Sequence, residues 1–316
     1  LETYNLVFPS VSLANFNWKR LLHKDVLYVP QVWATNPSAE VQYHRNYFPT
    51  DRDKRGTFGH QLIADFIKTY IGTLHIKGGS VKYAEPGKHG IDAVFRFTGI
   101  NGTFRNITNI DSLLERDKHC VAELAGRYGR RTNINAIFNL TRCDPKGSFA
   151  VSGTVSNLDA DDITQQSKAF SDIAINSFHL SHATTRQEGN EDASSGSYTL
   201  LYNNLNVTLL KDADSSKESK KPLQTFVANK IVLHPDNPIA GKGVRRASVK
   251  KTRDPGKGFM HFIWDNMYEA VKKTTYRDNV TANAEQRKDG DQQQKKGFLK
   301  QVFGGKGLSK LFKRHK

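Results

Sequence analysis

The histidines, clustered acids and cysteines are the residues of this 316-residue chain that could do chemistry, and their spacing decides what chemistry is open to them. His179 and His182 are three residues apart. That spacing could share a metal ion on a helix, but it puts the two side chains on opposite faces of a strand. The apolar residues at Ile173, Ile175 and Leu180 favour a strand, so we expect no metal site there.

Three acids, Asp159, Asp161 and Asp162, stand beside a predicted helix start. Capping of the free backbone N–H groups and favourable interaction with the helix dipole explain acids at this position better than general acid–base catalysis does. We therefore assign them a structural role.

Catalytic signatures are absent from the sequence. It has no G-x-S-x-G, no H-E-x-x-H and no G-x-x-x-x-G-K-[ST] pattern. Gly304-Gly305-Lys306-Gly307 resembles a phosphate-binding loop in composition, but it lacks the spacing and the preceding strand. The sequence predicts a protein that is not an enzyme, with no catalytic residues, no cofactor and no bound metal.

The two cysteines, Cys120 and Cys143, each lie near the end of an apolar stretch. They are either two free buried thiols or, in an oxidising compartment, one disulfide. No C-x-x-C spacing occurs, which excludes a zinc ribbon.

The net charge of +16 is concentrated at one end of the chain. Two stretches, Lys242–Lys257 and Lys295–Lys316, supply nearly all of it, and the rest of the chain is nearly neutral. The second stretch has the pattern of two short amphipathic helical turns, which is typical of segments that lie on anionic membranes. A solvated tail and a nucleic-acid-binding tail are the alternatives. The predicted membrane-facing residues are Phe298, Leu299, Val302, Phe303, Leu308, Leu311, Phe312, Lys295, Lys296, Lys300, Lys310, Lys313 and Arg314.

Most of the chain alternates apolar and polar residues with period two, as half-buried strands do. In Asn133–Thr141, the apolar side chains fall on one face and three asparagines fall on the other. Gly78-Gly79 lies between two such runs and predicts a hairpin. We therefore expect an antiparallel sheet with one apolar face over about residues 72–256.

Helical periodicity occurs in three places: Leu62–Tyr70, Leu158–Phe170 and Phe259–Lys273. We expect the third helix to pack Met260, Trp264 and Met267 against the end of the sheet. The predicted organisation is an upstream β region with a helix (1–71), the sheet (72–256), a capping helix (257–276), a polar linker (277–294) and the basic tail (295–316).

Several segments resemble the C-terminal part of AsmA-like proteins of the bacterial envelope, in the form found in Bacteroidetes. They are Leu74–Tyr83, Val151–Thr164, Ser195–Leu210, Leu223–Pro238 and Arg253–Thr275. The last of these contains the sequence R-D-P-G-K-G-F followed by an amphipathic helix. The resemblance covers about residues 60–276.

The resemblance implies a mainly β fold, in which a long curved antiparallel sheet forms an open apolar trough with a few short amphipathic helices. It implies a non-catalytic protein that holds or conducts phospholipid acyl chains along that trough in support of outer-membrane biogenesis. The partners would be phospholipid or another anionic lipid and a membrane surface, with no nucleic acid. The protein would lie in the periplasm, attached to the inner membrane by an N-terminal helix outside this chain.

With the alternation in the strands, the resemblance predicts a lipid groove on the apolar face. Its predicted residues are Ile134, Ala136, Phe138, Leu140, Phe149 and Val151. Two other functions remain open: a structural or adhesive envelope protein whose apolar face is filled by side chains, and a basic nucleic-acid-binding protein.

Overall fold

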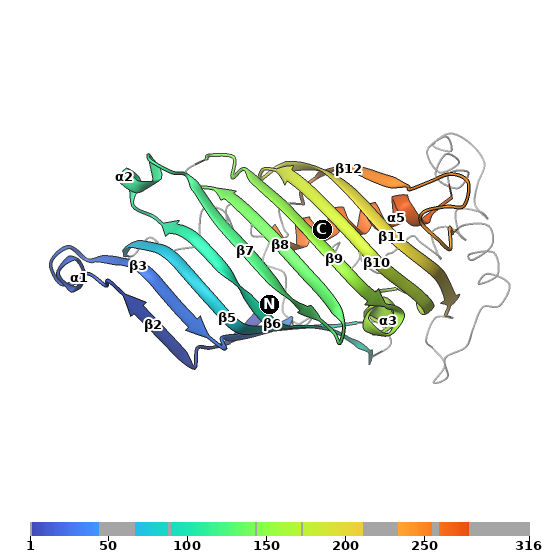
Figure 1. The fold of residues 1–316 in the computed structure, drawn as a ribbon, viewed down its shortest axis with the longest axis horizontal. Helices are drawn as coiled ribbons and strands as arrows, with labels where there is room; N and C mark the ends of the chain where they lie inside the picture. Colours follow the sequence, from blue (N-terminus) through green and yellow to red (C-terminus); the bar gives the residue numbers. More distant parts are fainter. Residues whose placement is uncertain are drawn as a thin grey trace, which may run out of the picture.

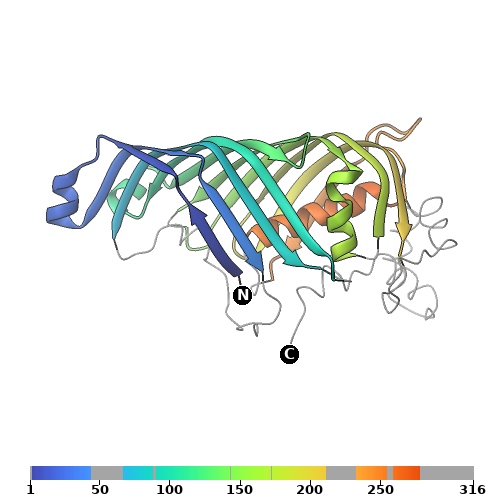
Figure 2. The ribbon, with the colours of Figure 1, turned by 90° about the horizontal axis from the view of Figure 1, so that it is seen from below.

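The fold is one large open sheet with four short helices in the described part of the chain (Figure 1). The computed structural model describes residues 2–43, 67–87, 90–142, 144–171, 173–210, 233–254 and 259–277. Seen from below, the sheet is curved, and α5 (Phe259–Thr275) lies on its concave side (Figure 2). The prediction of a mainly β protein with an open curved sheet and few short helices is confirmed.

Eight consecutive strands, each antiparallel to the next, form most of the sheet. They are β5 (Lys68–Pro86), β6 (Asp92–Thr108), β7 (His119–Tyr128), β8 (Thr132–Thr141), β9 (Phe149–Asp159), β10 (Ile173–Gly189), β11 (Ala193–Leu209) and β12 (Arg246–Thr252). The short helix α2 (Asp111–Leu114) joins β6 to β7, and α3 (Ala160–Phe170) joins β9 to β10.

The first 43 residues extend the same sheet. They form β1 (Glu2–Val7), β2 (Ser10–Ala14), α1 (Trp18–Lys24), β3 (Val26–Thr35) and β4 (Ser38–Tyr43). β1 pairs with β4 and β2 with β3, both antiparallel, whereas β3 and β4 both pair with β5 in parallel. All pairing among β5 to β12 is antiparallel, as predicted for residues 72–256. The parallel pairing joins β5 to the upstream strands, and the sequence did not predict it. Alternation in a sequence predicts a strand, but it does not predict the direction of the partner strand.

A line of irregularities crosses this end of the sheet. Pro9 separates β1 from β2, and Pro37 separates β3 from β4, directly opposite a bulge in β5 at Gly78. Gly78 has φ +70°, and a Cβ on it would lie 2.3 Å from Oδ1 of Asn36. Bulges bend strands and increase their twist. The break between β1 and β2, the break between β3 and β4 and the bulge in β5 therefore let this end of the sheet bend along one line.

The predicted hairpin at Gly78-Gly79 is wrong, because β5 runs through it. The strand continues across the break because backbone pairing resumes on both sides. The N–H of Asn36 donates to the carbonyl of Lys77 (2.7 Å), and the N–H of Ser80 donates to the carbonyl of Pro37 (2.9 Å). Neighbouring strands thus turn a local turn signal into a bulge.

Two of the three predicted helices are confirmed, as α3 and α5. The helix predicted over Leu62–Tyr70 is wrong at its C-terminal end, because β5 begins at Lys68 and pairs on both sides. Residues 62–66 lie outside the described residues, as do most of the predicted linker and all of the predicted basic tail.

Candidate functional site

The concave face of the sheet is apolar from β1 and β2 to β9. Directly paired side chains lie on the same face of a sheet, so the pairing traces that face from strand to strand. One row runs through Leu13, Val32, Leu74, Phe104, Ala122, Phe138 and Val151. A second row runs through Tyr4, Val41, Tyr83 and Phe95. The candidate functional site is this concave face.

Helix α5 covers one half of the concave face (Figure 2). Its N-terminal part buries Phe259, Phe262 and Ile263 against the middle strands, and its C-terminal part packs Ala270 against β11 and β12. The rings of Phe149 and Phe259 meet edge to face with centroids 4.8 Å apart. The sheet residues buried beneath the helix are Ile107, Cys120, Leu140, Phe149 and Val151.

A chain of buried polar groups fixes α5 against β10 and β11. Tyr198 donates its hydroxyl to Oε1 of Gln187 (3.1 Å), and Nε2 of Gln187 donates to Oγ of Ser194 (3.3 Å). That hydroxyl donates in turn to Oδ1 of Asn266 (3.2 Å), whose Nδ2 donates to the carbonyl of Phe262 (2.8 Å). Because a buried polar group is costly without a partner, this chain specifies one position of the helix on the sheet.

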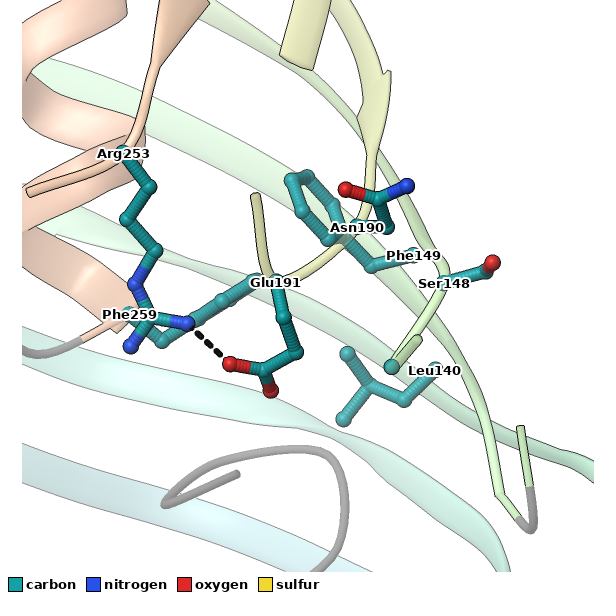
Figure 3. A pocket seen from close by; sticks show the side chains of 8 residues that line it. Leu140, Ser148, Phe149, Asn190, Glu191, Arg253 and Phe259 are labelled. Carbon is teal, nitrogen blue, oxygen red and sulfur yellow. Dashed lines mark hydrogen bonds and ion pairs between the residues drawn. The ribbon is translucent and has the colours of Figure 1, made fainter. Parts of the chain in front are cut away.

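A buried ion pair lies beside the start of α5, next to the covered half of the concave face (Figure 3). Nη1 of Arg253 lies 2.5 Å from Oε2 of Glu191, and both side chains are almost fully buried. The space next to them, between Leu140 and Phe259, measures about 10 Å³. That volume holds about one water molecule and cannot admit an acyl chain.

The predicted lipid groove falls largely under α5, so part of that prediction is wrong. Leu140, Phe149 and Val151 are at most 5% exposed and pack on the helix. Phe138 is partly buried against the same cluster. Ile134 and Ala136, farther along β8, are intermediate in exposure, and their place in a groove stays a prediction. The alternation identified the apolar face correctly, but it carries no information on what covers that face.

The predicted contacts of α5 are also partly wrong. Met260 and Trp264 are 54% and 45% exposed, whereas Met267 does pack against the core. The helix has two apolar stripes, and the sheet binds the one with Phe259, Phe262 and Ile263. The ring of Trp264 meets the ring of Phe95 on the concave face, with centroids 6.1 Å apart. Trp264 therefore stands at the boundary between the covered and the open half.

Within the described residues, exposed apolar side chains lie at the far end of the sheet from α5, on or beside β1 and β2. Five apolar side chains on or beside β1 and β2 are between 48% and 62% exposed: Tyr4, Leu6, Phe8, Val11 and Leu13. Four of them are directly paired with concave-face residues of β3 and β4. Their partners on β3, Val32 and Ala34, are only 7% and 4% exposed, so the exposure is confined to the outermost strands. We call the concave residues of β1 and β2 the open face. Exposed apolar side chains that gather on one face mark a binding site more often than scattered ones do.

Sequence reasoning missed the open face, although its signal was present. Residues 3–6 and 10–13 alternate polar and apolar side chains, as strands with one apolar face do. Only the pairing with β3 and β4 shows that these side chains continue the face that α5 covers farther along.

The histidines and acids that the sequence offered for chemistry lie on or beside β10 and α3. His179 and His182 lie on β10, and Nδ1 of His179 is 2.7 Å from Oδ1 of Asp159. Asp161 and Asp162 lie in the first turn of α3, as predicted. In the described part of the chain, no three metal-ligating side chains come together.

Cys120 is buried in the core, where desolvation raises the pKa of its thiol. Cys143 and Gly304–Gly307 lie outside the described residues.

Comparison with protein-family models, with curated proteins and with solved structures found no match. None of the helices described is long and apolar enough to cross a bilayer.

Removing the buried ring of Phe262 should loosen α5. We expect Phe262→Ala to lower the free energy of unfolding by about 3–5 kcal/mol, because it leaves a cavity in the core. Met260→Ala, on the exposed side of the same helix, should cost less than about 1 kcal/mol. Urea unfolding of both variants measures the difference, and equal losses would contradict this description of α5.

Two Arg–Glu pairs among the described residues, Arg253–Glu191 and Arg105–Glu123, should differ in strength because they differ in burial. Arg253→Met leaves the carboxylate of Glu191 buried without its main partner, at a cost of about 3–5 kcal/mol. Arg105 and Glu123 are 2.6 Å apart but about half exposed, so Arg105→Met should cost only about 0–1 kcal/mol. Comparable losses in urea unfolding would show that the burial of the first pair is not what matters.

Stability should fall at alkaline pH in a way that depends on Tyr198. Burial raises the pKa of Tyr198 to about 12, above its ordinary value of 10. The stability that its neutral form contributes is thus present below pH 10 and is lost as pH rises toward 12. Tyr198→Phe should lose less stability than the unmodified chain between about pH 9 and pH 12. Parallel losses in both proteins would contradict the assignment.

Proposed function

We propose that this protein binds the acyl chains of phospholipid, or of another anionic lipid, on the open face without catalysing a reaction. The observation that carries the proposal is the exposure of Tyr4, Leu6, Phe8, Val11 and Leu13 beside the buried, helix-covered half of the same face. An exposed apolar surface that continues a protein core needs an apolar partner, and an acyl chain has the extended shape that a row of strands can hold.

The physical basis is burial of hydrocarbon. Each CH₂ group removed from water contributes about 0.8 kcal/mol, so a chain of ordinary length is held firmly. Apolar contact is also non-directional, and a chain can therefore slide along the face without breaking specific bonds. The alternation along β2 leaves polar residues such as Ser10 and Ser12 on the opposite face, so lipid is expected on the concave side only.

The resemblance to AsmA-like proteins supports the same function and adds a setting. Two of the resembling segments form β9 with the start of α3, and α5, the helix that covers the other half of the concave face. On this basis we propose a place in the bacterial periplasm and a role in supplying lipid for outer-membrane biogenesis.

A structural or adhesive envelope protein is the second candidate, and one observation favours it. Under α5, the apolar face is filled by side chains of the described residues, and the space beside Leu140 and Phe259 is only about 10 Å³. If segments outside the described residues cover the open face in the same way, the protein holds no lipid. The two functions predict opposite results in one experiment.

Substitutions on the two faces of β2 separate these functions. Val11→Asp with Leu13→Asp puts two charges on the open face, where binding an acyl chain would desolvate them at a high cost. Ser10→Asp with Ser12→Asp adds the same charge to the opposite face of the same strand. Each chain is incubated with anionic phospholipid and repurified, and the retained lipid is then quantified by mass spectrometry.

We expect the first double variant to retain about tenfold less lipid than the unmodified chain, and the second to retain the normal amount. Circular dichroism checks that both variants keep the sheet. Equal retention by the two folded variants, or no retention by the unmodified chain, would refute acyl-chain binding on the open face.

A further inference from the structure

Helix α1 projects from the end of the molecule that carries the open face, away from α5 (Figures 1 and 2). It joins β2 to β3, and none of its residues is buried. Trp18 and Leu22, one helical turn apart, are 63% and 73% exposed. Large apolar side chains so exposed at an extremity are costly in water, and they suggest a contact outside the molecule.

The helix is held in one orientation despite its length of seven residues. Oδ1 of Asn17 accepts a hydrogen bond from the N–H of Arg20 (3.0 Å), and Asp25 ends the helix in the left-handed conformation. The guanidinium of Arg20 lies over the ring of Tyr28, which in turn stacks on Tyr70 of β5. The exposed positions of Trp18 and Leu22 are therefore set by the fold.

The charges around these two residues are positive. Within residues 17–25 there are three Lys or Arg residues and one histidine, His23, against a single acid, Asp25. Lys19 and Lys24 are exposed. Tryptophan favours the boundary between headgroups and hydrocarbon, and basic side chains favour anionic headgroups. An apolar pair surrounded by basic groups matches the surface of an anionic bilayer, whereas a protein groove would match only the apolar pair.

From this combination we infer that α1 is a membrane-contact tip, which inserts Trp18 and Leu22 into the headgroup boundary of an anionic phospholipid bilayer. Strand β2, which leads into α1, belongs to the open face, so the contact brings that face to the membrane surface. The membrane contact itself does not require the proposed function. Only its use for loading or unloading lipid rests on acyl-chain binding.

The three tryptophans of the chain allow a direct test, because each lies on a different surface. In the full chain with Trp33→Phe and Trp264→Phe, Trp18 is the only fluorescent tryptophan. Vesicles of brominated phosphatidylglycerol should quench it strongly, and vesicles of brominated phosphatidylcholine should quench it weakly. The control chain, with Trp18→Phe and Trp264→Phe, reports from Trp33, which stacks on His75 on the convex face and should stay unquenched.

Charge reversal tests the electrostatic part of the inference. In the Trp18 reporter chain, Lys19→Glu with Lys24→Glu should raise the vesicle concentration for half-maximal quenching by about tenfold. Arg116→Glu with Lys118→Glu changes the net charge equally at an exposed site beyond α2 and should leave that concentration nearly unchanged. The comparison separates a local contact of α1 from a general effect of charge.

Three results would overturn the membrane-contact tip. The first is vesicle binding without quenching of Trp18, and the second is equal quenching by the two lipids. The third is a Trp18 signal that changes with protein concentration in the absence of vesicles, which would indicate contact with a second copy. Lipid retention on β2 is measured independently. Normal retention without Trp18 quenching overturns the tip alone, whereas quenching without retention overturns the proposed function alone.

Discussion

The structure depends on a mismatch between the length of a concave apolar face and the length of the helix that packs on it. The sheet has ten strand positions in its main order, and nine spacings of about 4.8 Å make it roughly 43 Å wide. Helix α5 has 17 residues, which at about 1.5 Å each span only about 25 Å. One helix of this length can cover little more than half of the face.

The mismatch gives the two halves different physical roles. The covered half holds the core, the polar chain ending at Asn266 and the buried pair of Arg253 with Glu191, so α5 has one position there. The open half has the breaks at Pro9 and Pro37 and the bulge at Gly78, which bend the strands while their pairing continues. A firmly packed half thus adjoins a curved half whose outermost apolar side chains, on β1 and β2, are exposed.

The sequence predicted the local structure of this protein better than its assembly. Period-two alternation and helical stripes are properties of single segments, so most strands, α3 and α5 could be predicted from the sequence. Parallel pairing of β3 and β4 with β5, and the bulge at Gly78, depend on distant partners and were missed. The groove was placed on the correct face but at residues such as Phe149 that α5 buries, because a pattern along one strand does not show what lies above it.

If acyl chains lie on the open face, a bound lipid should map to it. The full chain is loaded with phospholipid that carries a photoreactive group midway along one acyl chain, irradiated and digested, and the modified residues are identified by mass spectrometry. We expect modification of Tyr4, Leu6, Val11 and Leu13. Modification confined to the convex face, for example at Ser10 and Ser12, or found mainly at Phe149 and Val151 beneath α5, would contradict it.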